Sequence, residues 1–150
     1  MHSNVSNVKN KMVLVKNKNI YYPELSYEIT GLLFKTHNEL GRFKTERQYG
    51  DFFEELLKSN RYNYCREINL KNIFKDCIDG NIPDFVLENK IIIDFKAKKF
   101  ITKEDYFQMV RYLDVADLPL GIIVNFRHTY LKPKRILNKK FHSNNSSVHS

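Results

Sequence analysis

The spacing of apolar side chains predicts helices in the first half of the chain and again towards its end. Between residues 23 and 40, apolar positions recur at steps of three and four, and Pro23 and Gly41 suit the first turn and the end of such a helix. A similar stripe runs through residues 45–58, which begin with a threonine, a typical N-cap. Residues 103–117 predict a third helix. Its expected packing face consists of Tyr106, Met109, Val110 and Leu113.

Shorter runs rich in β-branched and aromatic residues predict strands between and after these helices. Residues 82–87 and 90–95 flank a polar connection and are typical of a β-hairpin. Residues 120–126, which include GIIVNF, predict a buried strand beside that hairpin. Weaker patterns predict strands at residues 12–15, 62–70 and 73–78, the last before a turn at Asp79 and Gly80. The order ααβββαβ indicates an α/β domain with a central mixed β-sheet flanked by helices.

The predicted hairpin brings ionisable side chains together. With a three-residue loop at residues 88–90, Asp84 lies directly across from Asp94 on the same face. Side chains two residues apart in a strand share a face, so Lys96 joins Asp94 there. Two carboxylates and an ammonium group therefore converge on one side of a hairpin that is otherwise apolar.

Burying these charges is costly unless they pair or bind a cation, which leaves two interpretations open. In the first, Lys96 makes a salt bridge to one of the acids at a solvent boundary, a common arrangement at strand ends. In the second, the carboxylates supply oxygen ligands for Mg²⁺, an ion that keeps several waters and bridges to phosphate oxygens. Lys96 would then position the attacking water, help to deprotonate it, or stabilise negative charge on the phosphate.

Length, composition and charge limit the other possibilities. The 150 residues make one domain, expected at residues 21–137 between a basic segment, 1–20, and a disordered polar tail, 138–150. The net charge of +8 suits a polyanionic partner. No run resembles a signal peptide or a membrane span, which predicts an intracellular, cytoplasmic protein without a membrane partner. The two cysteines and five histidines lack the spacing of a disulfide scaffold or a zinc site.

The acidic residues of the hairpin belong to a short sequence motif. Pro83 and Asp84 are followed, after nine intervening residues, by Asp94, Phe95 and Lys96. This arrangement resembles the PD-(D/E)xK signature of the restriction-endonuclease-like superfamily. The resemblance implies a restriction-endonuclease-like core and the activity of a metal-dependent nuclease that hydrolyses phosphodiester bonds, with DNA as the expected nucleic acid.

Other motifs extend the resemblance in both directions along the chain. Upstream, Gly41, Glu46 and Tyr49 resemble the signature of the GxxExxY protein family within that superfamily. Downstream, Gln108 and Tyr112 lie in QMVRY, and GIIVNF follows. The motifs occur in the family's order and extend over most of the chain.

The resemblance implies a metal site and its ligands. Asp84, Asp94 and the backbone carbonyl of Phe95 are the expected ligands of Mg²⁺ or Mn²⁺, with Glu46 as an additional carboxylate. Lys96 is expected to assist the attacking water. The family usually has glutamate where this chain has Asp94, and the shorter side chain leaves the number of bound metal ions open.

The same resemblance assigns supporting roles to residues that helical spacing alone would treat differently. Gln108 is expected to approach the catalytic edge, whereas Tyr112 and Tyr49 are expected to support the site. From spacing alone, Gln108 and Tyr112 lie off the apolar stripe and would be surface residues, and Glu46 would be a helix cap. The family often has a second glycine where this chain has Phe43, so the loop before Glu46 is expected to follow a different path.

Basic residues provide candidate contacts to nucleic acid, although runs of lysine are usually solvated tails. These candidates are Lys98, Lys99, Lys132, Lys134 and Arg135. Alternatives to a nuclease are a catalytically silent module that binds nucleic acid or a protein partner, and an accessory subunit of a larger DNA-processing or defence system. Double-strand cleavage would favour a homodimer, and the sequence distinguishes neither DNA from RNA nor a monomer from a dimer.

Overall fold

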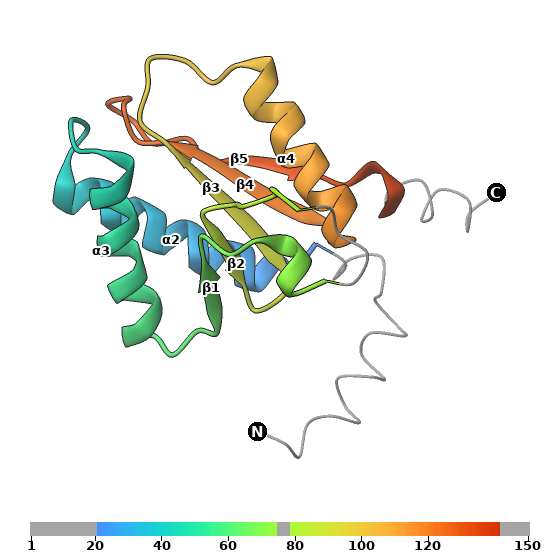
Figure 1. Cartoon of the computed structure of the whole chain (residues 1–150). Helices are drawn as coiled ribbons and strands as arrows, with labels where there is room; N and C mark the ends of the chain where they lie inside the picture. Colours follow the sequence, from blue (N-terminus) through green and yellow to red (C-terminus); the bar gives the residue numbers. More distant parts are fainter. Residues whose placement is uncertain (1–20, 75–78, 142–150) are drawn as a thin grey trace.

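The computed structural model describes residues 21–74 and 79–141 and has the predicted α/β architecture, a mixed sheet flanked by helices (Figure 1). The elements in chain order are α2 (Pro23–Leu40), α3 (Glu46–Ser59), β1 (Tyr64–Arg66), the 3₁₀ turn η2 (Leu70–Asn72), β2 (Phe85–Leu87), β3 (Ile91–Lys96), α4 (Lys103–Ala116), β4 (Leu120–Asn125) and β5 (Lys134–Leu137). None of the helices in the described residues combines the length and the apolar composition needed to cross a bilayer.

The strands of the described residues form a five-stranded sheet in the order β1-β2-β3-β4-β5. Neighbouring strands are antiparallel except β3 and β4, which pair in parallel. A parallel pair requires a crossover connection, and α4 provides it. Helices α2 and α3 lie on one face of the sheet and α4 lies on the other (Figure 1). Their buried side chains form two clusters, one on each face. The ends of β3 and β4 therefore lie between two helical layers.

The helices begin and end where local side chains satisfy the backbone. Pro23 occupies the first turn of α2, and Gly41 ends it with φ of 78°, a conformation that favours glycine. Thr45 caps α3 through a reciprocal capping box with Gln48. Thr102 caps α4 in the same way with an aspartate at the third helical position. The helices predicted at residues 23–40, 45–58 and 103–117 are confirmed, with bounds that differ by one residue at most.

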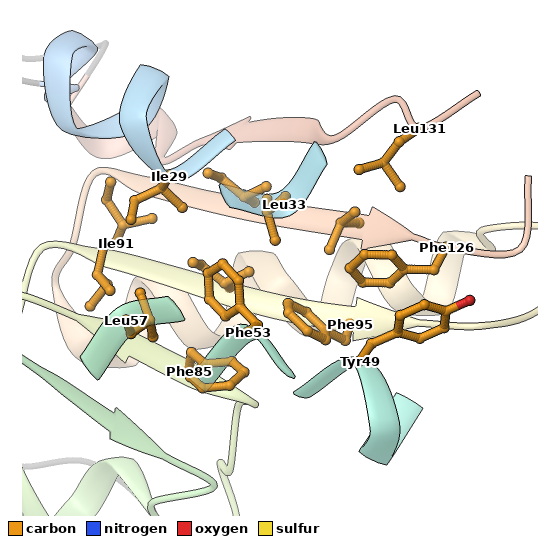
Figure 2. Packing of buried hydrophobic residues seen from close by; sticks show 14 of the residues in the cluster. Ile29, Leu33, Tyr49, Phe53, Leu57, Phe85, Ile91, Phe95, Phe126 and Leu131 are labelled. Atoms are coloured by element: carbon orange, nitrogen blue, oxygen red, sulfur yellow. The ribbon is translucent and has the colours of Figure 1, made fainter. Parts of the chain in front are cut away.

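An aromatic cluster holds α3 against the sheet (Figure 2). The ring centroid of Phe53 lies 5.1 Å from that of Phe85 and 5.3 Å from that of Phe95. Tyr49, one turn earlier in α3, stacks on Phe126 with a centroid separation of 4.1 Å. Full burial of one such apolar side chain contributes about 1.5–3 kcal/mol. The cluster thereby fixes the helix whose first residue is Glu46.

The strand predicted at residues 62–70 is wrong in its extent. Only Tyr64–Arg66 forms a strand there, because Glu67 adopts a left-handed conformation with φ of 52° and Leu70 begins η2. The turn predicted at Asp79 and Gly80 is present, with φ of 97° at Gly80. Ile73 and Phe74 are not part of a strand, and the rest of the segment predicted at residues 73–78 lies outside the described residues.

The packed face of α4 differs from the prediction, because Val110 is 38% exposed, whereas Tyr112 is 4% exposed and belongs to that face.

The end of the domain also contains a strand that the sequence pattern does not indicate. Strand β5 was not predicted, because Ile136 is its only buried residue. Asn138, the first residue of the predicted tail, donates from its side-chain amide to the backbone carbonyls of Leu113 and Leu118 at 3.2 and 3.0 Å. The strand predicted at residues 12–15 and the tail at 142–150 lie outside the described residues.

Candidate active site

The register of the β2–β3 hairpin places Asp84 opposite Asp94, as the sequence predicts. Phe85 pairs with Ile93, so the next positions along the two strands are the two aspartates. The backbone N–H of Asp84 donates to Oδ1 of Asp94 at 3.2 Å. In return, the backbone N–H of Phe95 donates to Oδ2 of Asp84 at 2.6 Å. The two carboxylates therefore lie side by side at the end of the hairpin, each fixed by the other strand's backbone.

The hairpin loop sets this register. Glu88 and Asn89 both adopt left-handed conformations, with φ of 54° and 53°, and the N–H of Lys90 donates to the carbonyl of Leu87 at 2.9 Å. Consecutive left-handed residues give a tight loop whose twist matches that of the flanking strands. The loop thus determines which residues of β2 and β3 face each other.

Burial makes Asp84 an unusual acid. Desolvation, followed by the negative charge of Asp94, raises the pKa of Asp84 to about 7, against the opposing effect of the Phe95 N–H donor. Asp94 is itself buried. A cation beside two neighbouring carboxylates would be favourable, because it relieves both their repulsion and the cost of their burial.

Lys96 supplies positive charge on the other side of Asp94. Its Nζ lies 3.1 Å from Oδ2 of Asp94 and 3.7 Å from Oδ1 of Asp105, and it donates to Oε1 of Gln108 at 3.3 Å. Burial alone would lower the pKa of Lys96, but the charge and hydrogen bond of Asp94, and then Asp105, outweigh it and raise that pKa. The side chain is therefore a positioned cation at neutral pH.

Asp105 joins this network, although sequence reasoning missed it. It forms the capping box of α4 with Thr102 and accepts from Nζ of Lys98 at 2.5 Å. Burial would raise the pKa of Asp105, but its bonds to Lys98 and Thr102 outweigh that effect and lower it. The threonine and aspartate three residues apart predict a helix cap, but they carry no signal that the aspartate also contacts two lysines.

The predicted site residues of α4 also approach the acids. Gln108, the partner of Lys96, is half-buried instead of lying on the surface. The hydroxyl of Tyr112 donates to the carbonyl of Ile82 at 3.4 Å. Desolvation, then the charges of Asp94 and Asp84, raises the pKa of Tyr112 to about 12. Both residues thus lie next to the hairpin's charged end, where the surface positions inferred from spacing were wrong.

Glu46 reaches the site from α3. Its Oε2 accepts from the backbone N–H of Ala97 at 3.3 Å, just beyond β3. Tyr49 is buried, and its hydroxyl donates to the carbonyl of Gly41 and accepts from the N–H of Lys44 at 3.2 Å. Tyr49 thus holds the loop between Gly41 and Lys44, which precedes Glu46, in place by two hydrogen bonds.

A cavity of about 240 Å³ connects Glu46 with Asp84. Arg66 of β1 also borders it, with Nη1 at 2.7 Å from Asp51 and 2.9 Å from Glu54. A side chain in place of Gly50 would collide with this guanidinium, because its Cβ would lie 2.6 Å from Nη2. Sequence reasoning missed Arg66, since its approach to α3 depends on the space above Gly50 and no motif includes the arginine.

The chemistry of these donors fits a hard divalent cation. Asp84 and Asp94 are adjacent carboxylates, and Phe95, whose carbonyl is a third oxygen, lines the same cavity as Asp84 and Glu46. Mg²⁺ is usually bound by one or two carboxylates and keeps several waters, so it does not require an all-protein cage. Accordingly, the described residues contain no group of three or more His, Cys, Asp or Glu side chains arranged to hold an ion by themselves.

The candidate nucleic-acid contacts are dispersed over the surface. Lys99, Lys132 and Lys134 are exposed, whereas the Nζ of Lys98 is paired with an aspartate. Lys134 and Arg135 are neighbours in β5, so their side chains point to opposite faces of the sheet. The structure therefore brings Lys132 and Lys134 together but separates them from Arg135.

Comparison with known proteins agrees with this geometry. Residues 23–137 match the model of the PD-(D/E)XK nuclease superfamily, a range that includes every described element of the sheet. Neither the curated proteins nor the solved structures include a significant match to the chain. The match supports a nuclease-like function and confirms the restriction-endonuclease-like fold predicted from the motifs. The chain belongs to the PD-(D/E)XK nuclease superfamily.

Proposed function

We propose that this protein is a metal-dependent nuclease that hydrolyses phosphodiester bonds, with DNA as its expected substrate. The observation that carries the proposal is the side-by-side arrangement of Asp84 and Asp94, with Lys96 held 3.1 Å from the second acid. A salt bridge alone would account for Lys96 and Asp94. It would not account for Asp84, whose carboxylate accepts a backbone N–H but no cationic side chain among the described residues.

Asp84, Asp94 and the carbonyl of Phe95 are the proposed ligands of Mg²⁺ or Mn²⁺, with Glu46 as an additional carboxylate. The bound ion would polarise the phosphodiester and stabilise negative charge on its oxygens. Glu46 lines the same cavity as Asp84, which supports its inclusion. The contact between Tyr49 and Gly41 supports placing the chain in the GxxExxY family, because these signature residues form one structural unit.

Lys96 is proposed to act as a cation. Because its pKa is raised, it holds its protons near neutral pH and is poorly suited to deprotonate water. A fixed positive charge beside the acids would instead orient the attacking water or stabilise charge that develops on the phosphate. Gln108 and Asp105 hold the ammonium group in place by the contacts described above.

Cleavage of labelled single- and double-stranded DNA and RNA tests the proposal, with Mg²⁺, Mn²⁺ or EDTA present. Asp84→Asn and Lys96→Gln should each abolish metal-dependent cutting. Glu39→Gln and Lys35→Ala, which change exposed charges on α2, should not. Circular dichroism would establish that all four variants are folded.

Two results would contradict the nuclease proposal. The first is cutting that persists in EDTA or in both site variants. The second is the absence of cutting on every substrate together with no metal binding by calorimetry. The second result would favour a silent binding module, and copurification of a partner would favour an accessory subunit of a larger complex.

A further inference from the structure

A groove of about 560 Å³ lies between the loop that follows β3, the strands β4 and β5, and the loop that connects these two strands. Figure 1 shows the loop between β3 and α4 and the loop between β4 and β5 at the same end of the sheet. These two loops and the adjoining strands form the groove, which we call the basic-aromatic groove. Its lining residues are Phe100, Ile101, Ile123, Asn125, His128, Thr129, Tyr130, Lys132 and Lys134.

The charge of the basic-aromatic groove distinguishes it from the other large cavities. Its described lining contains the exposed lysines Lys132 and Lys134 and neither Asp nor Glu. The cavity between α4 and β5, of about 500 Å³, is lined in part by Asp114, and the cavity beside Asp84 also contains acids. The basic-aromatic groove is therefore the one among these three whose ionised groups all favour a polyanion.

Two exposed aromatic rings lie at the rim of this groove. Phe100 is 66% exposed and Tyr130 is 78% exposed, so neither ring contributes much to the folded core. Exposed aromatic rings between lysines provide stacking surfaces for nucleic-acid bases, while the lysines contact the phosphates. Stacking requires an unpaired base, because the faces of paired bases in a duplex are covered by their neighbours.

The loop that carries Tyr130 is fixed by contacts to distant parts of the chain. Arg42 donates from Nε to the carbonyl of Arg127 at 2.8 Å and from Nη1 to Oγ1 of Thr129 at 3.0 Å. Arg127 in turn donates from Nη2 to the carbonyl of Ala97 at 3.0 Å. The rim of the groove is thus tied both to the loop before α3 and to the end of β3.

The strand register connects the groove to the acids. Ile123 of β4 pairs with Asp94 on one side and with Lys134 on the other. Adjacent strands are separated by about 4.8 Å, so the backbones at Asp94 and Lys134 lie roughly 10 Å apart on one continuous sheet. Asn125, which pairs with Lys96, lines the groove and donates to the carbonyl of Lys98 at 2.7 Å. The groove therefore lies within about two strand spacings of the charged end of the hairpin.

We propose that the basic-aromatic groove binds a single-stranded polynucleotide and directs it to the candidate active site. Bases stack on Phe100 and Tyr130, and Lys132 and Lys134 neutralise phosphates. The inference rests on the proposed nuclease function, because it specifies the substrate class of that site. It also predicts that cleavage favours single strands or unpaired ends over intact duplex.

Fluorescence anisotropy in EDTA tests binding separately from cleavage. The probes are a labelled single-stranded oligonucleotide, its duplex, and an abasic strand of the same length and charge. Replacing Phe100 and Tyr130 together by alanine should weaken single-strand binding by about 10-fold or more and leave abasic-strand binding nearly unchanged. Tyr27→Ala, which removes an 82% exposed tyrosine on α2, is the matched control and should bind like wild type.

The lysines provide a second, independent readout. Lys132→Gln and Lys134→Gln should each weaken binding to both single-stranded probes. Each should also make the slope of log binding constant against log salt concentration shallower, by about 0.7 for each phosphate that is no longer neutralised. Lys35→Gln on α2 should change neither quantity. DNA and RNA versions of the strand identify the preferred sugar.

Separate outcomes test the groove and the nuclease. Wild-type affinity in the double aromatic variant, or tighter binding of duplex than of single strand, would overturn the groove inference even if the protein cuts DNA. Stacking-dependent binding, with no cleavage of any substrate and no metal binding by calorimetry, would uphold the groove and contradict the proposed function. Cleavage of single strands that disappears with the aromatic rings would support both.

Discussion

Replacing Asp84 by asparagine should stabilise the metal-free protein at neutral and alkaline pH, although it should abolish the proposed activity. The ionised Asp84 is half-buried beside the buried Asp94, and its desolvation and repulsion raise the free energy of the folded state. Asparagine has nearly the same shape, keeps an oxygen that accepts the Phe95 N–H, and removes the charge. A residue selected for stability would not be an ionised aspartate here.

The pKa of Asp84 determines the size and sign of this effect. It rises from 3.8 to about 7 on folding, and a tenfold change in proton affinity corresponds to about 1.4 kcal/mol. The folded protein therefore holds a proton between these values that the unfolded chain has lost, and wild-type stability falls as the pH rises through that window. The full cost above pH 7 is about 4 kcal/mol, and the variant's advantage should grow by about 3 kcal/mol between pH 5 and pH 8.

Urea unfolding in EDTA at pH 5 and pH 8 measures this change. For each protein, the free energy of unfolding at pH 8 is subtracted from that at pH 5, and the two differences are compared. Titrating groups that wild type and variant share contribute equally to both differences and cancel. Asp114→Asn, at an exposed position of α4, controls for removal of a negative charge that is not part of the pair. The reasoning is refuted if the advantage of Asp84→Asn is equal at the two pH values or shrinks as the pH rises.

Three further perturbations test the site and its support. Mg²⁺ at 100 times its dissociation constant should stabilise wild type by about 2.7 kcal/mol in thermal unfolding, with no comparable gain in Asp84→Asn. Gly121→Ala should cost about 1–3 kcal/mol in urea unfolding, because its Cβ would lie 2.8 Å from Cγ of Met109, and Met109→Ala should relieve part of that cost in the double variant. Thr45→Ala should cost about 1 kcal/mol by removing the cap of α3, whereas Thr45→Ser should retain most of that stability.

The sequence predicted best those features that depend on nearby residues. Pro23, Gly41 and Thr45 mark helix ends because each acts on its own backbone or on that of the next turn. The opposition of Asp84 and Asp94 could be predicted because a hairpin's register follows from its short loop. Hydrophobic periodicity and the residue preferences of turns are local properties, so a single sequence is enough to recognise them.

The features that were missed depend on distant partners. The N–H of Glu67 donates to the carbonyl of Asp84 while Glu67 adopts a left-handed conformation, and alternation of side chains could not reveal that break in the strand. In β5, Ile136 is the one buried residue among lysine and arginine neighbours, so the strand resembles a solvated tail. Gln108 was placed only by resemblance, because its contact with Lys96 joins a helix and a strand in three dimensions.

The hairpin loop also constrains how this site can change in length during evolution. Lengthening β2 and β3 by one residue each would move the loop outward and leave Asp84 opposite Asp94. Inserting a single residue into one strand would instead pair Asp84 with a neighbour of Asp94, and the two acids would then point to opposite faces of the sheet. Between the two acids, insertions that preserve this loop are therefore tolerated only in matched pairs, and the number of residues that separates them keeps its parity.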